Sequence, residues 1–462
     1  MSVTSDSLRV RMYRQGLGDC FLITVTTGGV VRHALIDCGL VSGSPDADQR
    51  MTQVAQNIHD TTGGHLDVLA ATHEHWDHIS GFVQAPEVFA TLTIGEVWLA
   101  WTEDPKDPDA AKLLAARNRS IRALTGAANA LQASGSEQAD RLRDLLGFYG
   151  DRGVAGGGPT TADAMAWLKA RPVVRYLSPA QTFAALGLRV FVLGPPRDPA
   201  LIHRSDPGAT PGEVYTFAGN PELDGFLAAA QALSPAVDAD PDPEYGPDLQ
   251  PFDAFFRLDK REAARHPLIK KEYLDPELEW RRIDQDWLGS ADVLALNLDG
   301  DTNNTSLVLA FELPDGSMLL FPGDAQVGSW LSWQTVTWTT DSGPLTGPEL
   351  LARTRMYKVG HHGSHNATLR AQGLELMRSP DLVAMISVNR VTAHKKQWNH
   401  MPLPGLIDAL KQRTGGRLLD AELGSPATNA AALPDATWQN FVTHTDVQDL
   451  WVDHTITWPA SR

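Results

Sequence analysis

Three imidazoles and two carboxylates fall within six consecutive residues of this chain, in the sequence His73-Glu-His-Trp-Asp-His78. The largely apolar run 66–72 precedes them and predicts a buried strand that ends in a turn carrying these side chains. On extended backbone His73 and His75 point the same way, because side chains alternate along a strand, and Asp77 with His78 can face a second ion. Imidazole and carboxylate ligands together suit zinc, manganese or iron. The residue types and their spacing therefore favour a metal-binding motif over a set of ordinary polar histidines.

The pattern His-x-His-x-Asp-His resembles the first motif of the metallo-β-lactamase superfamily. The resemblance implies that later sequence supplies a bridging aspartate and a further histidine, each at the end of a strand. Both are present: the apolar run 317–321 ends in Pro-Gly-Asp324, and the run 355–359 leads into Gly-His361-His362-Gly-Ser. By this resemblance Asp324 would bridge two ions, and His361 or His362 would complete the second position. The sequence does not choose between these two histidines.

Further motifs, taken in order along the chain, narrow the resemblance. They are Gln15-Gly-x-Gly-Asp19, Leu-Ile-Asp37-x-Gly, Asn303-Asn304-Thr-Ser-Leu-Val-Leu, Gly-Asp and His-His-Gly-Ser. Together they look like the metallo-β-lactamase-type domain of the ComEC family of bacterial DNA-uptake proteins and its soluble relatives. The resemblance covers roughly residues 8–85, 173–196 and 291–425. It implies an α/β (α+β) fold, the four-layer αββα metallo-β-lactamase sandwich, here with a large helical and irregular insertion.

The chain departs from the wider superfamily ahead of the bridging aspartate. Many members place a histidine there, whereas residues 299–306 contain none, and ComEC-like members share this asparagine-rich replacement. The resemblance then gives the first metal position two histidines and the bridging aspartate, with Asp301 or an asparagine as a weak oxygen donor. We expect the two divalent ions to be Zn²⁺. A larger share of oxygen ligands also admits Mn²⁺. Alternatively, Asn303 and Asn304 form a tight turn before a strand at 306–311, since asparagine tolerates left-handed backbone.

A pair of cations that share an aspartate lowers the pKa of a bound water from about 16 toward 7 and provides a hydroxide nucleophile at neutral pH. The resemblance and this chemistry assign a role to each candidate residue. The candidate metal ligands are His73, His75, Asp77, His78, Asp324, His361 and His362, and the residues expected to orient them are Asp19, Asp37 and Asn303. The candidate catalytic residues are Asp77, Lys358 and His400, and the candidate substrate-binding residues are Asn304, Ser364 and His365. His400 is alternatively a surface residue that caps a helix at 403–414.

Composition and periodicity change along the chain and divide it into parts. Apolar segments at 8–14, 20–26 and 30–37 predict an opening antiparallel set of strands, and a helix is expected at 52–60. The segment 103–172 is rich in Ala, Leu and Arg at helical spacing, whereas 197–290 is rich in Pro, Asp and Gly. We expect a first part of the core at 1–102, a helical insertion at 103–172, core strands at 173–196, an inserted lid or cap at 197–290 and a second part of the core at 291–462.

Charge and cysteine content restrict the partners and the compartment. The net charge of −17 disfavours bulk duplex nucleic acid, because proteins that grip it usually carry a basic excess. A cluster of Arg390, Lys395 and Lys396 is either a local basic strip or a solvated loop. No apolar run is long enough to span a bilayer and no secretory signal is visible, so we expect a cytoplasmic protein with no membrane partner. Cys20 and Cys38 fall in neighbouring predicted strands, where two buried thiols are favoured over a disulfide.

Three classes of function fit these observations. The first is a metal-dependent phosphodiesterase or nuclease that acts on a nucleotide or single-stranded nucleic acid, which the resemblance to ComEC-like domains favours. The second is a hydrolase of another ester, amide or lactone, because the same ligand set serves all of these reactions. The third is a metal-binding interaction module without catalysis, which the retention of the other ligands disfavours.

Overall fold

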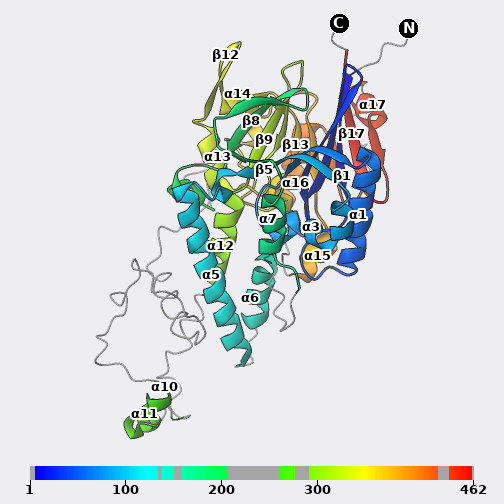
Figure 1. The fold of residues 1–462 in the computed structure, drawn as a ribbon. Helices are drawn as coiled ribbons and strands as arrows, with labels where there is room; N and C mark the ends of the chain where they lie inside the picture. The colour runs from blue at the N-terminus through cyan, green and yellow to red at the C-terminus, as the bar shows by residue number, and fades with distance from the viewer. Residues whose placement is uncertain are drawn as a thin grey trace. The chain divides into compact units, whose positions relative to one another are not determined.

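The computed structural model describes residues 6–133, 138–149, 158–205, 260–263, 265–273, 275, 291–396, 398, 400–424 and 436–459. The chain divides into two compact units (Figure 1). The first comprises Met1–Leu114, Gly147–Thr216 and Asp299–Arg462, and the second comprises Ala115–Leu146 and Phe217–Leu298. The first unit holds both large sheets and every candidate site residue.

An eight-stranded sheet contains the start and the end of the first unit. In spatial order its strands are β16 (Thr445–Val447), β17 (Trp451–Trp458), β1 (Asp6–Tyr13), β2 (Cys20–Thr27), β3 (Val30–Cys38), β4 (His65–Ala70), β5 (Thr93–Ala100) and β6 (Val174–Leu177). The strands from β16 to β3 pair antiparallel, and those from β3 to β6 pair parallel. The opening antiparallel strands expected from the sequence are therefore present. Cys20 lies opposite Cys38, and both are buried free thiols.

The second sheet has seven strands and a similar mixture of directions. In spatial order they are β15 (Leu418–Asp420), β14 (Val383–Ile386), β13 (Thr354–Lys358), β10 (Met318–Phe321), β9 (Val308–Glu312), β8 (Leu188–Gly194) and β7 (Thr182–Ala185). The strands from β15 to β10 are parallel, and those from β10 to β7 are antiparallel. A separate ribbon pairs β11 (Thr337–Thr340) with β12 (Gly343–Thr346).

Both faces of each sheet are buried, because alternate residues of a strand point to opposite sides. In β2, Phe21 and Ile23 enter a core that the two sheets share, whereas Leu22 enters a core shared with helices. In β9, Phe311 belongs to the core between the sheets and Ala310 to another helix-lined core. The result is the four-layer αββα sandwich that the sequence motifs imply.

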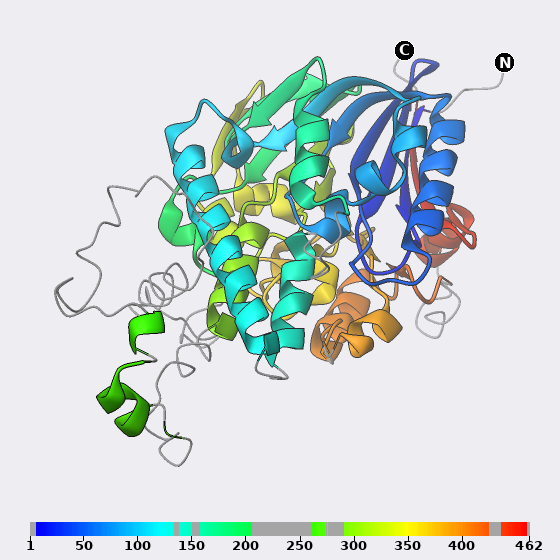
Figure 2. The ribbon, with the colours of Figure 1, turned by 60° about the horizontal axis from the view of Figure 1, so that its bottom comes forward.

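Helices of the first unit cover the outer faces of the sheets (Figure 2). Those packed on the first sheet are α1 (Ala47–Thr62), α3 (Gly81–Gln84), α4 (Pro86–Phe89) and α7 (Thr161–Lys169). Those packed on the second are α13 (Val327–Trp333), α14 (Gly347–Ala352), α15 (Arg390–Lys395) and α16 (Pro404–Thr414). Shorter or marginal elements are α2 (Trp76–Ile79), η1 (Trp101–Glu103), η2 (Gly147–Tyr149), α8 (Pro199–Ile202), η8 (Gly360–Gly363), η9 (Leu374–Leu376) and α17 (Ala436–Thr443).

The expected helical segment at 103–172 contains α5 (Pro108–Ala133), α6 (Gln138–Leu146) and α7. Within the second unit, α5 and α6 bury Leu124, Ala128 and Leu142. This unit also contains α10 (Lys260–Ala263), α11 (Pro267–Glu272) and the start of α12 (Ala291–Asn304). Most of the expected lid or cap at 197–290 lies outside the described residues. Among the described helices, none combines the length and the apolar character that a membrane crossing requires.

One local expectation is wrong. Asn303 and Asn304 do not form a tight turn before a strand, because they are the last two residues of helix α12. The following strand begins at Val308 rather than at Ser306. The side-chain hydrogen bonds described below explain why two asparagines end this helix.

Candidate metal centre

Parallel strands of both sheets end at the candidate metal centre. In the first sheet Asp37 lies at the end of β3, and the His73–His78 motif follows β4, which runs parallel to β3. In the second sheet the parallel strands β10 and β13 are followed by Asp324 and His362. Because parallel strands end at a common edge, each sheet places its ligands at one edge, and the sandwich brings the two edges together.

Four side chains form what we call the aspartate–histidine cluster: Asp77, His78, Asp324 and His362. One ligand atom from each lies within 4.8 Å of the other three. The Nε2 atom of His362 is 2.9 Å from Asp77 Oδ2, and the Nε2 atom of His78 is 3.1 Å from Asp324 Oδ2. Two atoms that bind one ion at about 2 Å lie about 3 to 4 Å apart, so these separations suit a shared transition-metal ion.

The chemistry of these buried atoms also fits an ion. All four residues of the cluster are buried, and the Oδ1 atom of Asp77 has no hydrogen-bond partner among the residues that the structure describes. A buried polar atom without a partner is costly in a folded protein. A divalent cation at this point would supply the missing partner.

Groups behind the cluster fix the orientation of its two imidazoles. The Nδ1 atom of His78 lies 2.8 Å from Asp37 Oδ2, and the Nδ1 atom of His362 lies 2.6 Å from the carbonyl oxygen of Ser387. Each acceptor holds a proton on Nδ1, so Nε2 is the nitrogen that faces the cluster and would ligate an ion. Thr72 donates to both oxygens of Asp37, from its amide and its hydroxyl group, at 2.7 Å. Asp37 thus occupies the orienting place expected from the sequence.

His73 and His75 form a second group, which we call the histidine pair. The Nε2 atom of His73 lies 3.0 Å from the Nδ1 atom of His75. Burial and the neighbouring His78 lower the pKa of His73, and burial lowers the pKa of His75 to about 3. Both imidazoles are therefore neutral near pH 7 and have a lone pair available for a metal ion.

Lys358 lies beneath Asp324 rather than facing a substrate. Its ammonium group contacts Asp19, lies 3.2 Å from Asp324 Oδ1 and donates to the carbonyl oxygen of Gly323 at 2.8 Å. Burial disfavours its charge, but Asp19 and Asp324 outweigh that cost and raise the pKa of Lys358. With the side chain only 1% exposed and three oxygen partners for three N–H groups, Lys358 acts as an internal counter-ion. These contacts leave no donor for the phosphate contact that the sequence suggested.

The structure distinguishes the two consecutive histidines. His362 reaches the aspartate–histidine cluster, whereas the ring of His361 lies 2.9 Å from the hydroxyl group of Ser364 and 3.3 Å from Gln326 Nε2. The backbone amide of His361 donates to Asp324 Oδ1 at 3.0 Å. Both histidines have left-handed backbone, with φ of 42° and 49°. Such backbone is unfavourable for histidine and persists where surrounding contacts impose it.

The side chain of Asn304, the last residue of helix α12, is held by the neighbouring loops. The side chain of Asn304 donates to the carbonyl oxygens of Ile202 and Arg204 and accepts from the amides of Gln326 and Ser329. All of its hydrogen-bonding capacity is used, so it joins loops and has no group left for a substrate.

Other candidates from the sequence are distributed around the centre. Asp301 lies 2.9 Å from the exposed His203 and not beside the histidine pair. Asn303 donates to Asp299 Oδ2 at 3.1 Å. His365 and His400 are exposed, whereas the residues of the aspartate–histidine cluster and of the histidine pair are all buried.

Two neighbours of His75 were missed by the sequence analysis. The hydroxyl group of Tyr149 lies 3.3 Å from His75 Nε2, and the Oδ1 atom of Asp299 lies 3.7 Å from the same nitrogen. Burial, together with the nearby carboxylates of Asp77 and Asp324, raises the pKa of Asp299 to about 8. The sequence could have indicated the place of Asp299, because Asp299 and Asn303 are four residues apart and lie on one face of a helix. No comparable signal marks Tyr149, which lies within the expected helical insertion at 103–172.

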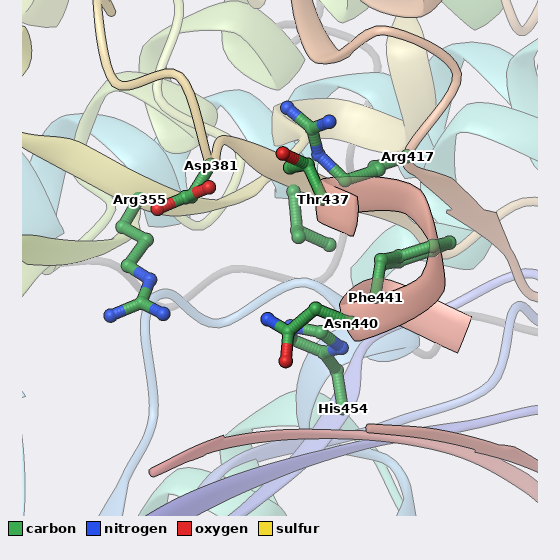
Figure 3. Close-up of a pocket in the computed structure, with 8 residues that line it drawn as sticks. Arg355, Asp381, Arg417, Thr437, Asn440, Phe441 and His454 are labelled. Carbon is green, nitrogen blue, oxygen red and sulfur yellow. The ribbon is translucent and has the colours of Figure 1, made fainter. Parts of the chain in front are cut away.

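A pocket away from these ligands does not belong to the centre (Figure 3). It is lined by Arg355, Asp381, Val383, Arg417, Thr437, Asn440, Phe441 and His454. Arg355 lies near the start of β13, whereas Lys358 ends that strand beneath Asp324. The pocket is therefore near the opposite end of β13 from the metal ligands.

Comparisons with known proteins add little to this geometry. No protein-family model and no curated protein matches the chain. Among solved structures, the chain is similar to MEM-A1, a subclass B3 metallo-β-lactamase isolated from a soil metagenome library. The sequence identity is 16%, the match covers 63% of this chain and 88% of that chain, and the TM-score is 0.18. A likeness at this TM-score carries no argument, so the interpretation of the centre depends on its own side chains.

Proposed function

We propose that this protein is a metal-dependent hydrolase with two divalent ions, and that it cleaves phosphodiesters in a nucleotide or in single-stranded nucleic acid. The observation that supports this proposal most directly is the convergence of four buried side chains, Asp77, His78, Asp324 and His362, whose ligand atoms lie within 4.8 Å of one another. Zn²⁺ suits the imidazole-rich ligands, and Mn²⁺ suits the carboxylates.

Ions bound at this centre would act as Lewis acids and would lower the pKa of water toward neutrality. The chain's own residues would hold and orient the reacting groups. The Oδ2 atom of Asp77 lies 2.9 Å from His362 Nε2. Asp77 would ligate one ion and is also the candidate acceptor of a proton from the attacking water. Asp37 would hold His78 in the tautomer that ligates, and Lys358 would keep Asp324 ionised.

The phosphodiester class rests on the order of sequence motifs, which resembles that of ComEC-like domains, and on the charge of the centre. A pair of cations would neutralise the oxygens of a phosphodiester and hold it in line for attack. The size of the substrate is limited by the net charge of −17. Arg390, one of the basic residues that cluster after the predicted strand, does not offset that charge, because it is paired with Asp420 and Glu422 at 2.7 and 2.9 Å.

The proposal is tested by supplying Zn²⁺ or Mn²⁺ and comparing three substrates: bis-p-nitrophenyl phosphate, a cyclic dinucleotide and a lactone. Turnover of the first two without the third supports phosphodiester chemistry, and turnover of the lactone alone points to another hydrolase. His362→Ala and Asp324→Ala should each lower kcat/KM by more than about 100-fold, because loss of a group that merely orients a ligand already costs 10- to 100-fold. His65→Ala, at an exposed histidine that begins β4, is the matched control. Activity that survives the double change His75→Ala with Asp324→Ala would exclude the mechanism.

A further inference from the structure

The two metal positions of the proposed centre differ in how many ligands the chain supplies. The aspartate–histidine cluster offers four ligand atoms that all lie within 4.8 Å of one another. Within the part of the chain that the structure describes, no such group of three or more His, Cys, Asp or Glu atoms includes His73 or His75. The histidine pair therefore contributes two imidazole nitrogens where the cluster contributes two nitrogens and two carboxylates.

The hydrogen-bond partners of the non-ligating imidazole nitrogens also favour the aspartate–histidine cluster over the histidine pair. In the cluster, His78 is backed by the carboxylate of Asp37 and His362 by a backbone carbonyl. In the histidine pair, the far nitrogen of His73 faces the hydroxyl groups of Thr72 and Ser306, at 3.1 and 3.3 Å. A carboxylate or carbonyl oxygen is a stronger acceptor than a hydroxyl oxygen and makes the ligating nitrogen more basic, so His73 is the less strongly supported ligand.

The other imidazole of the pair, His75, is also backed by weak partners. Its far nitrogen lies 3.3 Å from the hydroxyl group of Tyr149, which is itself 2.8 Å from the hydroxyl group of Thr302. The carboxylate of Asp299 is 3.7 Å from that nitrogen, beyond hydrogen-bond distance. Asp299 lies beside the Nε2 atom of His75, whereas His73 faces the Nδ1 atom. Asp299 therefore neighbours the far side of this imidazole and is not part of the pair's ligand group.

Asp324 does not compensate for the smaller number of ligands at the histidine pair. One oxygen of Asp324, Oδ1, already receives hydrogen bonds from Lys358 and from the amide of His361. Its other oxygen, Oδ2, lies 3.1 Å from the Nε2 atom of His78 and 3.8 Å from that of His362. A second ion at the histidine pair would have to share this Oδ2 atom with the ion of the cluster.

We infer that the two positions bind metal unequally, so that the aspartate–histidine cluster retains one ion while the histidine pair exchanges a second ion with the solution. This inference rests on the proposed metal centre but not on the substrate or on turnover. The difference in dissociation constant should be at least about 10- to 100-fold, the effect that outer hydrogen-bond partners alone have on metal affinity. The occupancy of the position at the histidine pair would then depend on the free metal concentration in solution.

The test is metal content, measured apart from activity. Full-length protein loaded with excess Zn²⁺ is passed through a desalting column and analysed by mass spectrometry for zinc per chain. It is then titrated with Co²⁺ after metal removal, because cobalt reports each filled position by its visible absorption. We expect about one retained zinc per chain and two separate phases in the cobalt titration.

Single changes assign the two phases to residues. His75→Ala should keep the retained ion and remove the weak phase, whereas His362→Ala should remove the retained ion. His73→Asn provides a second variant of the pair, and His65→Ala, at an exposed histidine, provides the control. Thermal unfolding of each variant establishes that it is folded. The inference is overturned by two zinc ions retained with equal affinity, by no retained zinc, or by loss of the retained ion in His75→Ala.

Discussion

Asp37→Asn isolates the contribution of a group that orients a metal ligand. Asp37 has left-handed backbone with φ of 57°, which asparagine also tolerates, so the change leaves the local conformation intact. The carboxylate accepts from His78 and twice from Thr72. Asparagine keeps one acceptor oxygen and introduces N–H donors, so at least one of these buried donors must face another donor.

The expected loss of metal affinity follows from the loss of that acceptor oxygen. When the buried carboxylate no longer fixes the Nδ1 proton of His78, metal affinity should fall by about 10- to 100-fold, or about 1.4 to 2.8 kcal/mol. A competition assay against a chromophoric zinc chelator measures the dissociation constant, and the ¹⁵N shifts of His78 report its tautomer. Asp67→Asn is the control, because Asp67 lies on β4, the strand that precedes the motif, and accepts from the amide of His33 at 2.7 Å. A zinc affinity within twofold of the wild-type value, with His78 in an altered tautomer, would refute the argument.

Three further predictions address packing, charge and pH. A Cβ atom on Gly39 would lie 2.2 Å from the carbonyl carbon of Asp77, so Gly39→Ala should displace the motif turn, and a normal zinc content and melting temperature would contradict this. Lys358→Met should lower the unfolding free energy by about 3 to 5 kcal/mol, because it breaks a buried ion pair, and zinc should restore part of it in urea titrations; no change in either would contradict the counter-ion role. Burial, with His444 and two arginines nearby, lowers the pKa of His454 from 6.5 to about 3, so the unfolded chain binds the proton more readily and stability should fall as the pH drops from 6.5 to 3, by up to about 4 to 5 kcal/mol. His454→Phe should flatten this dependence in unfolding experiments at several pH values, and an unchanged slope would contradict it.

The sequence predicted the ligand-bearing segments well for a topological reason. Each expected ligand follows an apolar run, and the carboxyl ends of parallel strands in one sheet meet at one edge. His78 and Asp324 are far apart in the chain, yet their ligand atoms lie 3.1 Å apart. The four-layer fold was likewise predicted, because the resemblance carried by the motifs implies it and the apolar strands are consistent with it.

The sequence could not show which of the candidate side chains point towards the metal centre. His361 and His362 have the same residue type and are adjacent, and the left-handed backbone that turns only His362 toward Asp77 leaves no mark in the sequence. Lys358 and Asn304 have the chemistry of phosphate-binding residues. Their burial and their complete sets of partners show that they serve the protein's interior instead.

The distribution of charge explains why the centre joins the two sheets. Asp77 and His78 follow a strand of the first sheet, whereas Asp324 and His362 follow strands of the second. Burial disfavours a charged imidazole at His78 and at His362, but the neighbouring carboxylates, Asp324 foremost, outweigh that cost and raise the pKa of both. Protons therefore compete with a divalent ion for the same nitrogens, and metal binding must release them. A cation at this point, whether proton or metal, thus adds to Lys358 in offsetting carboxylates that the fold brings together from both sheets.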